Sequence, residues 1–107
     1  MMATVMLLMT SAQAVERERA LDISAEFATH VWTMTESSET ASCDSSYQSD
    51  YTAGTWVGVP YDWGGFVTTD EFDAYLDKGY GAGSHSSDGV LWCTVGVDCS
   101  GFVSQAW

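Results

Sequence analysis

The thiol of Cys99 is the side chain of this sequence best suited to covalent chemistry. It lies in the run Asp-Cys-Ser-Gly at residues 98–101, where small neighbours leave room for a carbonyl group to approach the sulfur. The thiolate form of cysteine attacks acyl carbons, so a catalytic site must stabilise that form. This run makes Cys99 a candidate nucleophile.

The residues around Cys99 place it at the start of a predicted helix. Residues 95–97 favour extended chain, and apolar residues recur at helical spacing from Phe102 onward. We therefore expect Cys99 in the first turn of a helix, with Asp98 or the residue before it as N-cap. Unpaired N–H groups and the positive end of the helix dipole stabilise a thiolate there, and such N–H groups also form oxyanion holes. The negative charge of Asp98 destabilises this thiolate only slightly if its carboxylate accepts hydrogen bonds from the N–H groups at the helix start.

Cys99 is one of three cysteines, so at most one disulfide can form within the chain. Cys43 lies in a Ser-rich loop, and Cys93 lies in a predicted short strand at residues 90–95. A bond between them closes a loop of about 50 residues, which stabilises a fold by about 4 kcal/mol in the chain-entropy model. We expect this pair and a free Cys99, with two unpaired, buried thiols as the alternative. No Cys or His spacing predicts a metal site, and no cofactor is implied.

Two segments before the site are expected to form a helix and a loop. Residues 18–34 carry apolar side chains at steps of three and four, which predicts an amphipathic helix. His30 lies on or beside its apolar face and is interpreted as a helix histidine rather than a catalytic one. Residues 35–54 are polar and rich in Ser and Thr, which predicts a loop that Cys43 can pin.

A second, shorter helix is predicted from a capping box. Thr68 and Glu71 have the spacing at which each side chain bonds the other residue's backbone N–H. The helix that follows is expected to bury Phe72, Tyr75 and Leu76. A glycine-rich stretch then ends the helix and predicts a flexible loop over residues 79–87.

Composition and charge exclude several classes of protein. The chain has 107 residues, 46% hydrophobic and 17% charged, which fits one folded domain rather than a disordered chain. Its net charge is −12. The chain has only three Lys and Arg, which are too few to displace the counterions of a nucleic acid. No apolar run is long enough for a membrane-spanning helix.

The first fourteen residues resemble a secretory leader. Residues 1–14 carry no charged side chain, have an apolar run over residues 3–9, and end in the small-x-small pattern Ala12-Gln13-Ala14. We expect a signal peptide over 1–14 and a secreted domain over 15–107. An ordinary buried helix start is the alternative.

Two motifs in this order resemble a known enzyme family. Residues 61–65 read Tyr-Asp-Trp-Gly-Gly, and residues 98–103 read Asp-Cys-Ser-Gly-Phe-Val. This pair resembles the signature of NlpC-type cell-wall peptidases, which are papain-like cysteine enzymes that cut peptidoglycan stem peptides. The resemblance covers residues 55–107. It implies an α+β fold with the cysteine helix packed on an antiparallel sheet.

The resemblance also implies a role for each matching residue. Cys99 is the nucleophile, and the Tyr61 hydroxyl lies beside the thiol and positions the substrate or polarises its carbonyl. Asp98 and Ser100 line the pocket that receives the stem peptide and its free amine. Trp63 is expected at this substrate site as a packed indole, before a glycine turn that passes close to the thiol.

The chain departs from the family pattern in two places. The stretch 66–97 is longer than in compact members, which predicts an inserted helix and loop that the Cys43–Cys93 bridge holds over the cleft. The family's general base is a His on a strand after the cysteine helix, and neither that His nor its sheet is found here. His85, in a Gly/Ser loop, is not expected to replace it. We therefore interpret the chain as an N-terminal part of a longer enzyme, without efficient hydrolysis of its own.

The combined hypothesis is a secreted bacterial cysteine hydrolase, periplasmic or extracellular, that acts on peptidoglycan stem peptides. Two alternatives stay open. One is a papain-like acyl or amide transferase with the same thiol chemistry. The other is a secreted, non-catalytic binding module in which Cys99 is oxidised or buried.

Overall fold

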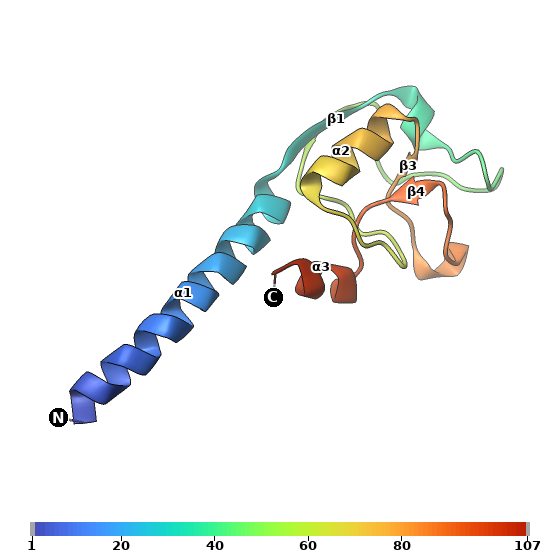
Figure 1. The fold of residues 1–107 in the computed structure, drawn as a ribbon. Helices are drawn as coiled ribbons and strands as arrows, with labels where there is room; N and C mark the ends of the chain where they lie inside the picture. Colours follow the sequence, from blue (N-terminus) through green and yellow to red (C-terminus); the bar gives the residue numbers. More distant parts are fainter. Residues whose placement is uncertain (1, 107) are drawn as a thin grey trace.

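The longest element is helix α1 (Met2–Thr29), which projects from the rest of the molecule (Figure 1). The structure, a computed structural model, describes residues 2–106, and it describes side chains from residue 14 onward. The side chains of the predicted leader up to residue 13 lie outside the described residues, so the leader stays a prediction. None of the described helices has the length and apolar character required to cross a membrane.

The helix predicted over residues 18–34 ends earlier than expected. α1 stops at Thr29, and Val31–Met34 form strand β1, in which Trp32 and Met34 are buried and the residues between are exposed. The Gly58 N–H donates a 2.8 Å hydrogen bond to the carbonyl of His30, just beyond the helix end. The sequence over 31–34 satisfies a period of two as well as steps of three and four, and contacts with distant residues select the strand.

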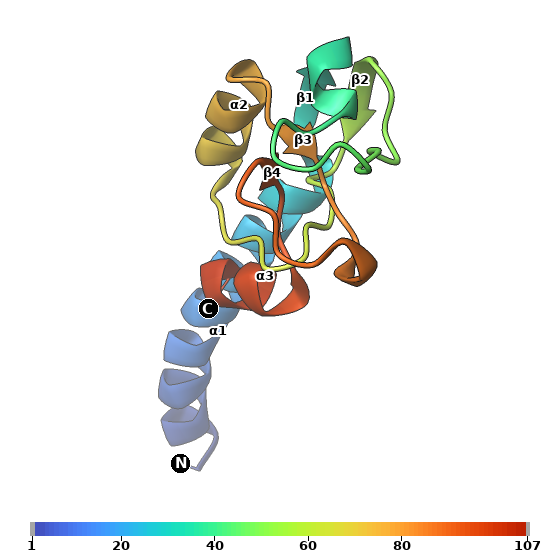
Figure 2. The same cartoon turned by 90° about the vertical axis from the view of Figure 1, so that its right-hand side faces the viewer.

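Two short sheets lie next to each other in the main body (Figure 2). In the first, β1 pairs antiparallel with β2 (Gly54–Val57). In the second, β3 (Gly81–Ala82) pairs in parallel with β4 (Thr94–Val95). Their inward side chains and those of helix α2 (Thr69–Asp77) form one core, which comprises Trp32, Met34, Phe72, Leu76, Ala82 and Val95. The described residues therefore form an α+β fold.

The capping box of α2 is confirmed. The Glu71 N–H donates to the Thr68 hydroxyl oxygen at 3.2 Å, and the Thr68 N–H donates to the Glu71 carboxylate at 2.9 Å. Phe72 and Leu76 are buried as predicted, whereas Tyr75 is only half-buried and packs at the edge of the core. Local sequence alone was sufficient for this helix.

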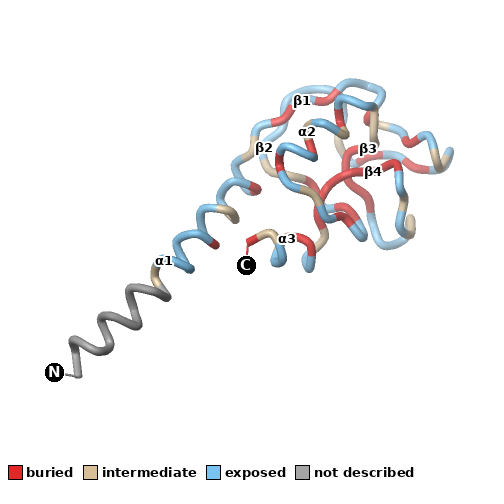
Figure 3. The backbone as a smooth tube through the Cα atoms, in the orientation of Figure 1, coloured by how far each residue is buried: buried red, intermediate tan, exposed pale blue. Residues whose placement is uncertain are grey.

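The segment predicted as a flexible loop over residues 79–87 is ordered. It contains β3 and leads into the short 3₁₀ helix η2 (Ser86–Asp88), and Ser84 between them is buried. Figure 3 shows buried backbone running through β3 and β4. The strand predicted over residues 90–95 is limited to Thr94–Val95, because only these residues pair with β3.

The predicted disulfide between Cys43 and Cys93 is present. Cys93 is buried and packs with Ala41 and Tyr47 in a second, smaller core. This bond joins the polar segment that contains the 3₁₀ helix η1 (Glu36–Glu39) to the segment that precedes β4. The long stretch between the two sequence motifs is therefore covalently held to the segment before β2.

The last described element is helix α3 (Cys99–Ala106), which begins at the residue predicted to be the nucleophile. It packs against α1, where the rings of Phe27 and Phe102 meet edge to face with centroids 5.7 Å apart. Ala106 and Ala20 are buried at this contact. The antiparallel sheet that the family resemblance implies against this helix was expected to be missing, and in the described residues the helix packs against α1.

Candidate functional site

Cys99 is a free, exposed thiol at the first residue of α3. Asp98 caps the helix, because its Oδ1 accepts the Gly101 N–H at 2.6 Å and the Ser100 hydroxyl at 2.9 Å. These hydrogen bonds, the Gly101 bond first, lower the pKa of the Asp98 carboxyl below its ordinary value. The Asp98 carboxylate thus accepts hydrogen bonds from the first turn of α3, as predicted for an N-cap residue. Among the described residues, no backbone carbonyl accepts the Cys99 N–H, as is usual for the first N–H groups of a helix.

Backbone hydrogen bonds bring the two sequence motifs together. Tyr61 pairs with Val97 in a parallel bridge, and the Asp62 N–H donates to the Val97 carbonyl at 3.1 Å. The Asp98 N–H donates to the Gly65 carbonyl at 3.0 Å. The first motif therefore runs beside the residues that lead into Cys99, although the two are far apart in the sequence.

Two glycines of the motifs are required by this close approach. A Cβ atom added to Gly101 would collide with the carbonyl oxygen of Gly65, and one added to Gly65 would collide with the carbonyl oxygen of Gly96. Both obstacles are backbone atoms, which cannot rotate away as a side-chain end can. The expectation of a glycine turn that lets the backbone pass close to the site is confirmed.

Tyr61 lies within electrostatic range of the thiol. Its side chain is partly exposed, and loss of water contacts, followed by the charges of Cys99, Asp98 and Asp62, raises the pKa of its hydroxyl above the ordinary value. The hydroxyl therefore stays protonated at neutral pH and can donate a hydrogen bond. The charge of Cys99 thus acts on the Tyr61 hydroxyl, and the expected position of this hydroxyl beside the thiol stays a prediction.

Trp63 does not lie where the sequence analysis expected it. It is 41% exposed rather than packed, and it lines a cavity with Phe66 and Val90 on the side of the motif that Asp62 faces. Tyr61 instead lines a second, more polar cavity of about 210 Å³ with Asp50, Ser84 and His85. Trp63 therefore does not join Tyr61 in one pocket, and the expectation of a packed indole is wrong.

Neither histidine contacts the thiol among the described hydrogen bonds. His30 Nε2 lies 2.7 Å from Asp73 Oδ1, and His85 Nε2 lies 2.5 Å from Asp50 Oδ2. His85 shares the smaller cavity with Tyr61, and Asp50 binds one of its two ring nitrogens. That neither residue acts as the base for Cys99 stays a prediction.

A buried carboxylate next to Tyr61 escaped the sequence analysis. Asp62 is 4% exposed, and its Oδ1 accepts the hydroxyls of Ser84 and Thr94, each at 2.7 Å. Ser84 also accepts the Trp63 N–H at 3.1 Å, and its own N–H donates to the Tyr61 carbonyl at 3.0 Å. Burial raises the pKa of the Asp62 carboxyl, against the lowering effect of the two hydroxyls. The only local signal was a carboxylate within an otherwise aromatic and glycine-rich motif.

No cluster of three or more His, Cys, Asp or Glu among residues 2–106 is arranged to hold a metal ion.

Comparisons of the chain with protein-family models, curated proteins and solved structures found no match. The resemblance to NlpC-type peptidases therefore depends on the two motifs, and what the structure adds is their contact in space.

Proposed function

We propose that this chain carries the nucleophile of a secreted, papain-like cysteine hydrolase of NlpC type that acts on peptidoglycan stem peptides. The observation that carries the proposal is a free, exposed Cys99 at the first residue of α3, directly after the backbone contacts that join the two motifs. A thiol at a helix start with hydroxyl and N–H donors nearby is suited to acyl transfer.

In the proposed reaction the Cys99 sulfur attacks the carbonyl carbon of a peptide amide. The carbonyl oxygen gains negative charge, which the Cys99 N–H and the Tyr61 hydroxyl stabilise. The proton of the Cys99 thiol passes to the amide nitrogen as the C–N bond breaks, so the amine leaves neutral and a thioester to Cys99 remains. No described hydrogen bond links either histidine to Cys99, so the proposal for these residues is limited to acylation.

The cavity that Tyr61 lines is the proposed binding site of the stem peptide. Asp50, Ser84 and His85 line it, and two of these residues come from the stretch between the motifs. This agrees with the expectation that the inserted stretch covers the cleft, while Asp98 and Ser100 are proposed to meet the free amine of the peptide. The disulfide fits an oxidising compartment, which supports secretion.

Acylation can be tested directly, because Cys99 is the only cysteine outside the disulfide. A stem-peptide probe that ends in a thiol-reactive acyloxymethyl ketone should label Cys99, as mass spectrometry would show. A diastereomeric probe with inverted stereocentres is the control, since both carry the same reactive group. We expect faster labelling by the stem-peptide probe, no labelling of Cys99→Ser, and roughly tenfold slower labelling of Tyr61→Phe.

Equal labelling by the two probes would show that Cys99 is merely an accessible thiol. Absence of labelling by both probes, and by iodoacetamide at pH 6, would favour the non-catalytic binding module instead. Labelling by a probe with an unrelated acyl group, at the rate of the stem-peptide probe, would favour the transferase alternative.

A further inference from the structure

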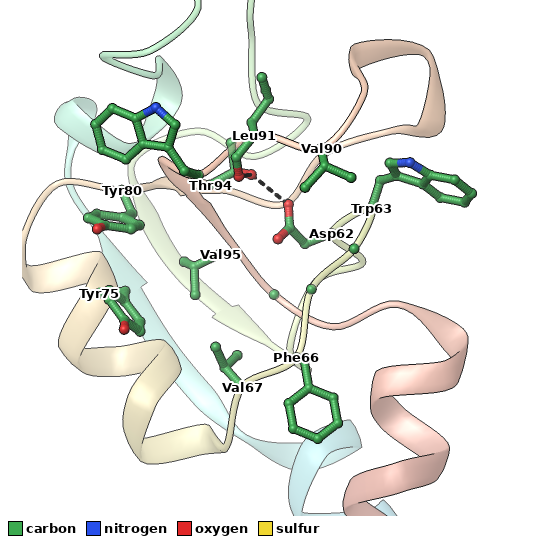
Figure 4. Close-up of a pocket in the computed structure, with 14 residues that line it drawn as sticks. Asp62, Trp63, Phe66, Val67, Tyr75, Tyr80, Val90, Leu91, Thr94 and Val95 are labelled. Carbon is green, nitrogen blue, oxygen red and sulfur yellow. Dashed lines mark hydrogen bonds between the residues drawn. The ribbon is translucent and has the colours of Figure 1, made fainter.

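A second cavity, which Tyr61 does not line, lies beside the first motif. Its volume is about 290 Å³, and α2, the segment after it and the chain before β4 surround it. Most of the residues that line it are apolar or aromatic, Trp92 among them, and Figure 4 shows Tyr75, Tyr80, Phe66 and Val95 around it. Trp92 is 71% exposed and stands at the rim. The volume is at the small end of ligand pockets, which are roughly 300–1,000 Å³.

One carboxylate interrupts this apolar lining. Asp62 lines the cavity, and its Oδ1 is occupied by the hydroxyls of Ser84 and Thr94. No described residue donates a hydrogen bond to its Oδ2. Figure 4 shows one carboxylate oxygen joined to Thr94 and the other turned away from it. A nearly buried carboxylate thus keeps one oxygen free at the wall of a cavity.

No cation of the described chain compensates this carboxylate. Asp62 forms no ion pair, and the one charge that acts on it strongly enough to shift its pKa is that of Asp98, which is also negative. The nearby Lys78 ammonium lies over the ring of Tyr75, 5.2 Å from its centroid. A desolvated, unpaired carboxylate is costly, and a cation placed against it recovers much of that cost.

We propose that this cavity binds an organic ammonium group. The ammonium donates to Asp62 Oδ2, and its short apolar body contacts Tyr75, Tyr80 and Trp92. The carboxylate favours the ammonium and the aromatic side chains favour the apolar body, so both parts of the cavity favour the same ligand. The group can belong to a small free amine or to a lysine-type side chain of a peptide. This site is separate from the cavity beside Tyr61, and it holds whether or not Cys99 is a catalytic nucleophile.

The two sources can be separated with matched pairs of probes. The first pair is n-butylammonium and 1-butanol, which have the same shape and differ in charge. The second pair is Nα-acetyl-lysine amide and its Nε-acetylated form. Binding to the full chain is followed at pH 7 by isothermal titration and by amide chemical-shift changes around the cavity. We expect each cation to bind at least about tenfold more tightly than its neutral partner. If butylammonium alone binds, the ligand is a free amine; if the lysine amide binds more tightly, it is a peptide side chain.

Asp62→Asn tests the charge, because it preserves the size of the side chain and an acceptor for Ser84 and Thr94. It should abolish the preference for the cation. Asp70→Asn, at an exposed position of α2, is the matched control and should bind as the original chain does. Trp92→Ala, at the exposed rim, should weaken binding several-fold without loss of folding, and circular dichroism confirms the fold of each variant.

Equal binding of the charged and neutral members of both pairs would overturn the proposal, as would no binding of either cation. Unchanged cation preference in a folded Asp62→Asn chain would also overturn it. If that variant does not fold, Trp92→Ala provides the test, and an unchanged affinity of this variant for the cation would contradict the proposed ammonium site.

Discussion

The N–H of Asp98 donates a 3.0 Å hydrogen bond to the carbonyl oxygen of Gly65, which joins the end of the first motif to the residue before Cys99. Gly101, on the first turn of α3, lies against the same carbonyl oxygen. One backbone group of the first motif thus sets the position of the helix that presents the thiol. The geometry of the candidate site depends on how closely these two segments approach.

Substitution of Gly101 by Ala should therefore destabilise the fold. In an unobstructed helix alanine is favoured over glycine by about 1 kcal/mol, so any loss reports the collision with Gly65. We expect the free energy of unfolding to fall by about 1–3 kcal/mol, measured by urea denaturation. Ser104→Ala, at an exposed position of the same helix, should be neutral or slightly stabilising. A Gly101→Ala chain as stable as the Ser104→Ala chain would show that the helix start can shift freely.

The capping role of Asp98 predicts a pH dependence of stability. Its hydrogen bonds lower the pKa of the carboxyl in the folded state, so it stabilises the fold above the unfolded-state pKa, about 4. This contribution is lost as the pH falls from about 4 through the lower, folded-state pKa. We expect Asp98→Asn to lower the melting temperature at pH 7 and to flatten the curve below pH 4. An Asp70→Asn control should keep the wild-type slope, and an Asp98→Asn curve parallel to it would contradict the cap.

Features that depend on neighbouring residues were predictable from the sequence. The capping box of Thr68 and Glu71 and the start of α3 at Cys99 each follow from residues a few positions apart. The disulfide followed from the small number of cysteines and the expectation of an oxidising compartment. These predictions are confirmed because contacts with the rest of the fold do not oppose them.

Features that depend on distant contacts were not predictable. Val31–Met34 fits both a helix and a strand, and pairing with β2 selects the strand. Asp62 is buried only because Ser84 and Thr94, 22 and 32 positions away, bring hydroxyls to it. The glycine-rich stretch after Gly79 has the composition of a mobile loop, and its pairing with β4 orders it. The roles assigned to Cys99 and Tyr61 stay predictions, although the structure brings the backbones of their two motifs together.

The disulfide should contribute strongly to stability. It joins residues separated by 50 positions, and closure of such a loop in the unfolded chain is worth about 4 kcal/mol in the chain-entropy model. We expect the double substitution Cys43→Ala, Cys93→Ala to lower the free energy of unfolding by about 2–4 kcal/mol in urea. Cys99→Ala, which leaves the bond intact, should change it little. If the single and double variants are equally stable, the segment before β2 is held by its other contacts.

The buried carboxylate of Asp62 predicts the opposite pH dependence from Asp98. Burial raises the pKa of the Asp62 carboxyl in the folded state, so the folded chain holds this proton more tightly than the unfolded chain does. The fold therefore loses stability as the pH rises from about 4 through the raised pKa. Asp62→Asn stays neutral at every pH and can still accept from Ser84 and Thr94. The melting temperature of the variant relative to the original chain should therefore increase between pH 4 and pH 7. A difference that is constant over this range would mean that water or an ion already compensates the carboxylate, whereas a decrease would mean that its charge stabilises the fold.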